Sequence, residues 1–217
     1  ALNIEDFSFN QIKEFSEINH KRANIINVYE EDVNIELGKQ TETGGKYAFK
    51  SLEAASIALL QGKVNVLVTA PINKENIQSP DFKFAGHTEY LDEKFGDGNS
   101  LMFLVSDDLR VAVVTGHIPV TQVAGALTIE KILKKVQVLN KSLIQDFEIR
   151  KPKIAVLGLN PHAGDNGVIG NEEQQIIIPA INKAKEEGIL AYGPYPADGF
   201  FGNGSYKKFD AVLAMYH

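Results

Sequence analysis

The stretch IAVLGLNPHAGDNG at residues 154–167 decides the expected fold. Its first six residues form an almost unbroken apolar run, which is typical of a strand buried on both faces of a parallel sheet. The polar loop that follows carries His162, and a helix is expected after it, with Asn171 and Gln174 in a capping-box-like start and Gly188 as its stop. A buried strand, a polar loop and a helix in succession favour an α/β fold.

The same succession recurs along the rest of the chain. Residues 47–61 have apolar positions near helical spacing and many good helix formers, and Gly62 is expected to end this helix. Thr128 is expected to be the N-cap of a long helix that begins at about residue 129. The other expected elements are a helix at residues 10–23 and strands at residues 25–29, 64–69, 101–105, 111–115, 189–192 and 209–215.

Composition limits the class of protein. The 217 residues are 44% hydrophobic and 23% charged, which is ample for a folded core and excludes a disordered chain. A net charge of −6 argues against a nucleic-acid partner, and the absence of cysteine excludes disulfides, thiolate metal ligands and cysteine nucleophiles. No apolar run approaches the roughly 20 residues of a membrane span, so no membrane partner is expected. The absence of cysteine fits a reducing compartment, and a cytoplasmic location is expected. Because the sequence starts at Ala1 and ends directly after an apolar run at His217, we expect an internal piece of a longer chain.

Four histidines occupy similar places in the sequence. His117, His162 and His217 each lie at or just beyond the end of a predicted strand, and His87 follows a short Phe-Ala-Gly segment. In open α/β sheets, ligands bind outside the carboxyl ends of the strands, so these residues are expected along one edge. Three neutral imidazoles with open coordination positions suit a catalytic metal site. The alternative is that each histidine only caps a strand end or bonds a backbone carbonyl, and His20 is given only that ordinary role.

Other polar residues allow two interpretations each. Thr88, directly after His87, could help bind an anionic ligand or simply start a helix. Residues 164–167 could offer backbone N–H groups to an anion or form an ordinary turn. Asp198 is a carboxylate near the same edge or a turn former before glycine, and Lys74 is expected to be a solvated loop residue. The chain has no GxGxxG, Walker A, GxSxG or HExxH pattern.

Six short motifs in one order resemble the 4-hydroxythreonine-4-phosphate dehydrogenase family of vitamin B6 (pyridoxal phosphate) biosynthesis. The resemblance is collinear from about Thr41 to the end of the chain. The motifs are VTAPINK at residues 68–74, GHTE at 86–89, GHIP at 116–119, LNPHAG at 159–164, YPAD at 195–198 and MYH at 215–217.

The resemblance implies a fold and an assembly. The fold would have two α/β/α domains similar to those of the isocitrate and isopropylmalate dehydrogenases, here incomplete at both ends, with a domain boundary that the sequence does not locate. The assembly would be a homodimer with its active sites at the subunit interface. The family's glycine-rich opening segment would precede residue 1, and its last substrate contacts would follow His217.

The resemblance also implies residues and a reaction. His117, His162 and His217 match the family's ligands for one divalent metal (zinc, magnesium or cobalt), and His87 and Thr88 match its substrate-binding pair. The reaction would oxidise 4-phosphooxy-L-threonine with NAD or NADP, and the 3-oxo acid would lose carbon dioxide to give 3-amino-2-oxopropyl phosphate. The proton acceptor is not assigned, with Asp198 as a weak candidate. The alternatives are a related dehydrogenase that acts on another small hydroxy acid, and an inactive metal-binding fragment.

Overall fold

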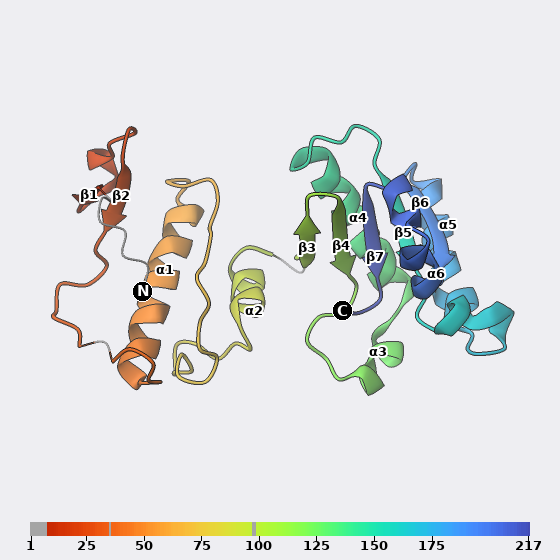
Figure 1. Ribbon diagram of the computed structural model, residues 1–217, viewed down its shortest axis with the longest axis horizontal. Helices are drawn as coiled ribbons and strands as arrows, with labels where there is room; N and C mark the ends of the chain where they lie inside the picture. The colour runs from red at the N-terminus through yellow and green to blue at the C-terminus, as the bar shows by residue number, and fades with distance from the viewer. Residues whose placement is uncertain (1–7, 35, 97–98) are drawn as a thin grey trace. The chain divides into compact units, whose positions relative to one another are not determined.

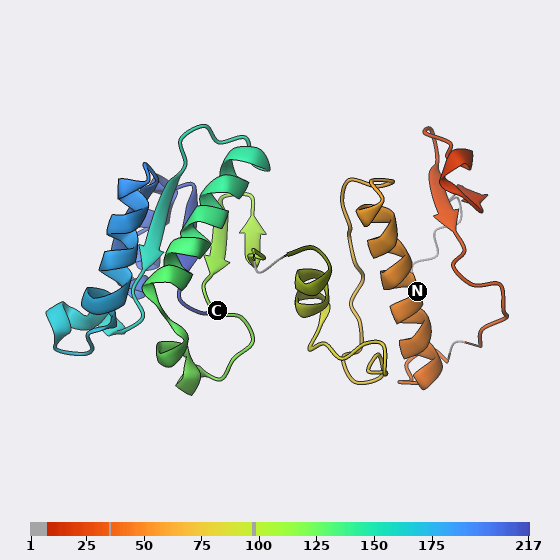
Figure 2. The same cartoon turned by 180° about the vertical axis from the view of Figure 1, so that it is seen from behind.

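The computed structural model describes residues 8–34, 36–96 and 99–217. These residues divide into two compact units, Ala1–Gly96 and Asp97–His217 (Figures 1 and 2). Each unit has its own hydrophobic core and is described by itself below.

The first unit is built around one long helix. α1 starts where Thr41 accepts a hydrogen bond from the backbone N–H of Gly44 at 3.1 Å. Gly45 permits the close approach of residues 76–77, because a Cβ there would lie 1.8 Å from the carbonyl oxygen of Asn76. The unit's elements are β1 (Phe9–Ile12), η1 (Phe15–Glu17), β2 (Ala23–Ile26), α1 (Glu42–Leu60), α2 (His87–Leu91) and η2 (Asp92–Gly96). Its main cluster of buried side chains consists of Leu52, Ile77, Phe82 and Tyr90.

Three expectations for the first unit need correction. The helix expected at residues 10–23 is wrong, because β1 pairs in parallel with β2 there and the residues between them form a 3-10 turn. The strand expected at residues 25–29 starts and ends earlier, as β2. Residues 64–69 follow α1 but form no strand among the described residues, and Val66 and Val68 stay 72% and 89% exposed. A run of β-branched residues forms a strand only when a neighbouring strand pairs with it, and none of the described segments of this unit pairs with residues 64–69.

The second unit is an α/β layer structure. Among residues 99–217, five strands form one sheet in the order β3-β4-β7-β5-β6, in which only the β3–β4 pairing is antiparallel. The strands are β3 (Phe103–Ser106), β4 (Leu109–Val113), β5 (Lys153–Leu157), β6 (Leu190–Tyr195) and β7 (Ala211–Ala214). The helical segments are α3 (Val120–Ala126), α4 (Ile129–Gln145), η3 (Pro161–Gly167), η4 (Glu173–Ile177), α5 (Ile178–Glu186), α6 (Ala197–Gly202) and η5 (Ser205–Lys208).

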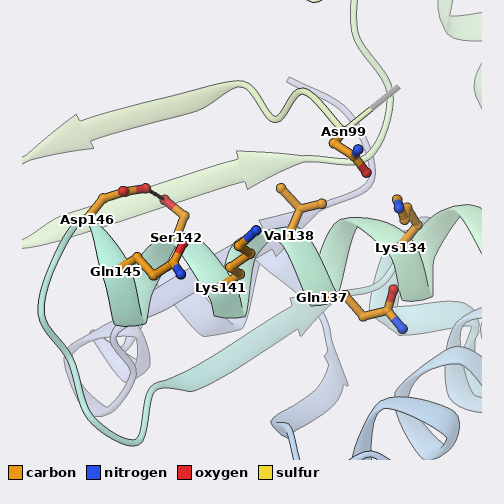
Figure 3. Close-up of a pocket in the computed structure, with 8 residues that line it drawn as sticks. All are labelled: Asn99, Lys134, Gln137, Val138, Lys141, Ser142, Gln145 and Asp146. Carbon is orange, nitrogen blue, oxygen red and sulfur yellow. Dashed lines mark hydrogen bonds between the residues drawn. The ribbon is translucent and has the colours of Figure 1, made fainter. Parts of the chain in front are cut away.

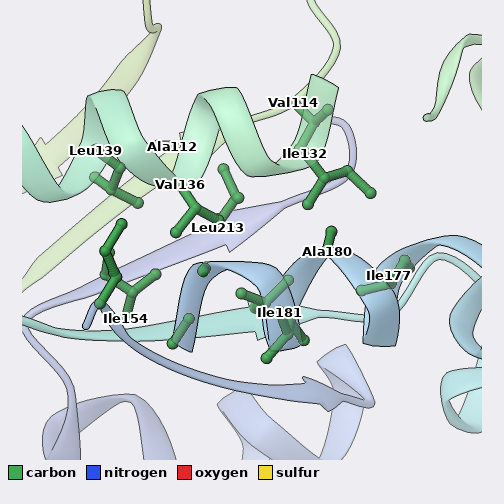
Figure 4. Packing of buried hydrophobic residues seen from close by; sticks show 14 of the residues in the cluster. Ala112, Val114, Ile132, Val136, Leu139, Ile154, Ile177, Ala180, Ile181 and Leu213 are labelled. Carbon is green, nitrogen blue, oxygen red and sulfur yellow. The ribbon is translucent and has the colours of Figure 1, made fainter. Parts of the chain in front are cut away.

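Both faces of this sheet are covered, and β5 shows how. Ile154 and Val156 pack with α4 and α5 into the larger core, of which Figure 4 shows Ile154 and its neighbours. Ala155 and Leu157 on the opposite face pack with Phe200 of α6. Because successive side chains of a strand point to opposite faces, the whole apolar run is buried, as its composition predicted. The α/β class with a largely parallel sheet is therefore confirmed.

Most strand and helix positions in this unit agree with expectation. All five strands lie within a few residues of the predicted ranges, and the Thr128 side chain caps α4 by accepting from the N–H of Lys131 at 3.1 Å. The helix start expected at Asn171 is confirmed, because residues from Glu172 onward are helical and the N–H of Gln175 donates to the carbonyl of Asn171 at 2.8 Å. The expected capping box is not seen there, since η4 starts without a side-chain cap hydrogen bond.

A test of this core is a large-to-small change on the central strand β7. Leu213 is fully buried against α4 and α5, so Leu213→Ala should lower the free energy of unfolding by about 2–5 kcal/mol, through lost apolar burial and the cavity left behind. The measurement is urea-induced unfolding followed by circular dichroism. The matched control is Leu104→Ala on β3, where the side chain is 49% exposed and the loss should stay below about 1 kcal/mol. Equal losses for the two variants would contradict the described core.

Candidate active site

The strands β4 and β7 continue to pair beyond their ends, and this continuation places two histidines together. The N–H of Thr115 donates to the carbonyl of Met215 at 3.1 Å, and the buried Thr115 hydroxyl donates to the same oxygen at 2.8 Å. Two residues further along each segment lie His117 and His217, whose ring centres are 5.7 Å apart in an edge-to-face arrangement. Both side chains are exposed at the carboxyl edge of the sheet.

His162 lies at the same edge of the sheet, after β5, in the turn η3. It lines a pocket of about 560 Å³ together with residues that follow β7 and residues of α6. Met215 and Tyr216, just before His217, and Asp198 of α6 face this pocket. His162 and Asp198 are both exposed, so each is accessible to a ligand in the pocket.

The structure brings the predicted metal ligands together only in part. Residues 8–34, 36–96 and 99–217 contain no group of three or more His, Asp or Glu side chains positioned to hold one metal ion. His117 and His217 form a pair, and His162 is not grouped with them. Two imidazoles can bind one metal ion, at about 2.0–2.1 Å from a nitrogen of each ring, only if they are close neighbours. His117 and His217 are close enough to be two ligands of one such ion. The three-histidine site stays a prediction.

His87 and Thr88 lie in the first unit, in the first turn of α2. The buried Gly86 is the N-cap, so the helix-start interpretation of Thr88 is correct, and the residue remains exposed. His87 lines a pocket formed by α1 and residues 67–72. Burial of the His87 imidazole lowers its pKa below the usual value of 6.5, because desolvation disfavours the charged ring. A neutral imidazole with one N–H is a hydrogen-bond donor for an uncharged or anionic oxygen.

Glu173 is a functional candidate that the sequence did not indicate. It stands between two polar residues, Glu172 and Gln174, and so looks like part of a solvated helix start. Its side chain is instead 2% exposed and accepts hydrogen bonds from the backbone N–H groups of Leu159 and Asn160. These two residues lie between the end of β5 and the turn that carries His162. The burial of this carboxylate depends on the fold of that turn, and no local pattern signals it. Residues 164–167, considered as an anion-binding loop, belong to the same turn.

Another surface depression in the second unit contains no predicted site residue. It follows one exposed side of α4, where Ser142 donates to Asp146 at 2.6 Å (Figure 3). The residues that line it are Asn99, Lys134, Gln137, Val138, Lys141, Ser142, Gln145 and Asp146.

In the part of the chain that the structure describes, every helix is too short or too polar to cross a membrane.

Comparison with known families gives the assignment. The family model of the pyridoxal phosphate biosynthetic protein PdxA matches residues 1–217. The chain belongs to the PdxA family. The resemblance carried by the six motifs is therefore confirmed.

Individual PdxA relatives agree with this assignment. A 4-hydroxythreonine-4-phosphate dehydrogenase of Bacteroides thetaiotaomicron is 49% identical over 218 residues, covering 100% of this chain and 60% of the relative. The enzyme of the same name from a Sulfurihydrogenibium species is 42% identical, over 98% of this chain and 65% of the relative. The chain thus spans 60–65% of the length of these two relatives.

Solved structures include a member of the same family and a more distant protein with the same fold. The crystal structure of 4-hydroxythreonine-4-phosphate dehydrogenase from Klebsiella pneumoniae matches with a TM-score of 0.81 and 31% identity, over 96% of this chain and 64% of that one. A terephthalate 1,2-cis-dihydrodiol dehydrogenase from Burkholderia xenovorans shares the fold, with a TM-score of 0.66 at 21% identity, over 97% of this chain and 64% of that one.

The lowered pKa of His87 can be measured. The imidazole resonances of His87 should titrate with a midpoint below 6.5 in an NMR pH series. In the unfolded chain the ring binds a proton as the pH falls past about 6.5, whereas the folded ring resists it, so this group destabilises the fold progressively as the pH drops below that value. Leu52→Ala opens the same pocket to water and should move the midpoint back toward 6.5. A midpoint at or above 6.5 in the unmodified protein would show that the His87 ring is solvated.

Proposed function

We propose that the protein containing this chain oxidises 4-phosphooxy-L-threonine with NAD or NADP and releases carbon dioxide, forming 3-amino-2-oxopropyl phosphate in pyridoxal phosphate biosynthesis. The observation that carries the proposal is the paired imidazoles of His117 and His217 at the carboxyl ends of adjacent strands, in a chain of the PdxA family. The activity stated in the names of its relatives supports the choice of substrate.

The metal-binding part of the proposal uses the chemistry of the residues present. His117 and His217 would hold a divalent metal, zinc, magnesium or cobalt, with His162 as the third ligand. When bound, the metal supplies a Lewis acid for the substrate oxygens during oxidation and decarboxylation. Neutral imidazoles add no negative charge, so they leave the charge of the cation available to those oxygens.

The remaining residues would bind and orient the substrate. His87, whose neutral form burial favours, can donate its N–H to a phosphate or carboxylate oxygen, and the hydroxyl of the exposed Thr88 beside it can do the same. Asp198 faces the pocket that His162 lines and is the candidate that accepts the hydroxyl proton. The nicotinamide cofactor supplies the hydride acceptor.

The assembly and location complete the proposal. All three predicted metal ligands are exposed in the single chain, as residues at an active site between two subunits of a homodimer must be. The two-domain fold similar to the isocitrate and isopropylmalate dehydrogenases and a cytoplasmic location are parts of the same proposal.

A second candidate function has one specific observation in its favour. The fold is shared with a dehydrogenase whose name specifies a terephthalate cis-dihydrodiol as its substrate, so this scaffold supports oxidation of more than one kind of hydroxyl compound. The discriminating measurement is the ratio of kcat/KM values for 4-phosphooxy-L-threonine and for non-phosphorylated hydroxy acids and diols. A preference for a non-phosphorylated compound would favour the second candidate.

The proposed metal ligands are tested by substitution in the full-length protein. Loss of a residue that only supports a metal ligand typically costs 10–100-fold, so loss of a ligand itself in His117→Ala or His162→Ala should lower NAD(P)H formation by more than about 100-fold. The fold should persist, because both side chains are exposed at the edge of the sheet. His20→Ala, at an exposed position in the first unit, is the matched control and should keep full activity. Full activity of His117→Ala after removal of free metal by a chelator would exclude the proposed site.

A further inference from the structure

The turn that carries His162 has an unusual backbone. Six consecutive residues of η3, from His162 to Gly167, adopt positive φ angles of 54, 52, 80, 42, 55 and 97°. Only Gly164 and Gly167 are glycines, and left-handed backbone costs free energy at each of the other four. Strained backbone of this kind persists only where the surrounding structure holds it, and it gathers at functional sites. The turn therefore needs a support outside itself.

The Glu173 carboxylate makes direct contact with the start of this turn. Its Oε1 accepts hydrogen bonds from the backbone N–H groups of Leu159 and Asn160, both at 2.8 Å, and its Oε2 accepts from the Asn160 side-chain amide at 3.0 Å. The side chain is 2% exposed, so these bonds form away from water, where they are stronger than on the surface. They fix two of the three residues that join β5 to the turn.

Two glycines show how closely the carboxylate is packed on both sides. A Cβ on Gly164, at the centre of the turn, would lie 2.6 Å from Oε2 of Glu173. A Cβ on Gly158, at the end of the strand, would lie 3.0 Å from Oε1. The carboxylate thus fills the space between the strand end and the turn, and it contacts the backbone of both.

We propose that Glu173 is the positioning residue for His162, because its carboxylate holds the end of β5 and the left-handed turn in the one arrangement that presents the imidazole at the edge of the sheet. The role in metal binding rests on the proposed function, whereas the support of the turn does not. Glu173 touches neither substrate nor metal in this role and acts only through the backbone that carries His162.

The charge state of Glu173 suits this role. Burial raises the pKa of its carboxyl, but the hydrogen bonds donated by Asn160 and Leu159 outweigh burial and hold the pKa below the usual range. The ionised carboxylate accepts at both oxygens, which matches the three donors that face it. A glutamine in its place would keep one accepting oxygen and turn its amide N–H groups toward the donor of Asn160.

Three variants of the full-length protein separate hydrogen bonding from packing. Glu173→Met keeps a buried side chain of similar size but removes both acceptors, and Glu173→Gln keeps one acceptor. Glu186→Gln is the control, since it removes the same charge from an exposed position of α5. Two quantities are measured: amide hydrogen exchange of residues 158–167 in metal-free protein, and the Kd for Zn²⁺ alone by titration calorimetry.

The expected results have a definite order. Glu173→Met should speed exchange of the Leu159 and Asn160 amides by at least about 10-fold and raise the Kd for Zn²⁺ by about 10–100-fold, the range found when the support of a metal ligand is lost. Glu173→Gln should show smaller changes in both, and Glu186→Gln should match the unmodified protein. If Glu173 only filled space, the methionine variant would behave like the unmodified protein, and that result would overturn the proposal.

Two further outcomes remain decisive. If Glu173→Met does not fold, Asn160→Ala replaces it, because this change removes the side-chain bonds of Asn160 to Glu173 and Glu172 and leaves the two backbone bonds to Glu173 in place. Glu172→Ala, which removes only the bond to Glu172, is its control and should leave the exchange unchanged. Asn160→Ala should speed exchange within residues 158–167, and unchanged exchange would overturn the proposal. If the unmodified protein binds no Zn²⁺, the proposed metal site fails, but the exchange measurement still decides whether Glu173 holds the turn.

Discussion

The second unit depends on the burial of one largely parallel sheet on both faces. In β5, Ile154, Ala155 and Val156 are all fully buried, so helices must cover the two sides of the strand. α4 and α5 cover one face, and α6 covers part of the other. With both faces covered, the edges of the sheet are where side chains can meet a ligand, and the carboxyl edge is the one that receives the loops after β4, β5 and β7. Each of these three loops carries one histidine.

The sequence alone placed these histidines at strand ends, but it did not show which of them lie beside one another. An apolar run followed by a polar loop marks where a strand ends, and that local signal was sufficient for His117, His162 and His217. The pairing of His117 with His217 depends on β4 lying beside β7, although these strands are about 100 residues apart in sequence. Strand order is a property of the whole sheet, so the local pattern could not show which two imidazoles would meet.

The errors in the first unit have the same origin. Residues 64–69 have the composition of a strand, yet β propensity mainly measures how well a side chain packs on a neighbouring strand, and no described segment of that unit provides one. Residues 10–23 were expected to be helical, whereas the parallel pairing of β1 with β2 sets their structure. By contrast, the start of α1 and of α4 rests on a threonine side chain and an N–H three residues later, so for α4 the cap was correctly predicted.

Glu173 illustrates the same limit at a functional position. An acid between two polar neighbours at a helix start is ordinarily solvated, and a buried carboxylate is costly unless donors surround it. Here the main donors are the backbone N–H groups of two residues between β5 and the turn, Leu159 and Asn160. These N–H groups lie beyond the end of the strand and need an acceptor, and the buried carboxylate needs donors, so each stabilises the other. Gly158 and Gly164 complete this arrangement by giving up the side-chain volume that the carboxylate occupies. The turn that carries His162 is therefore held by residues outside the turn itself.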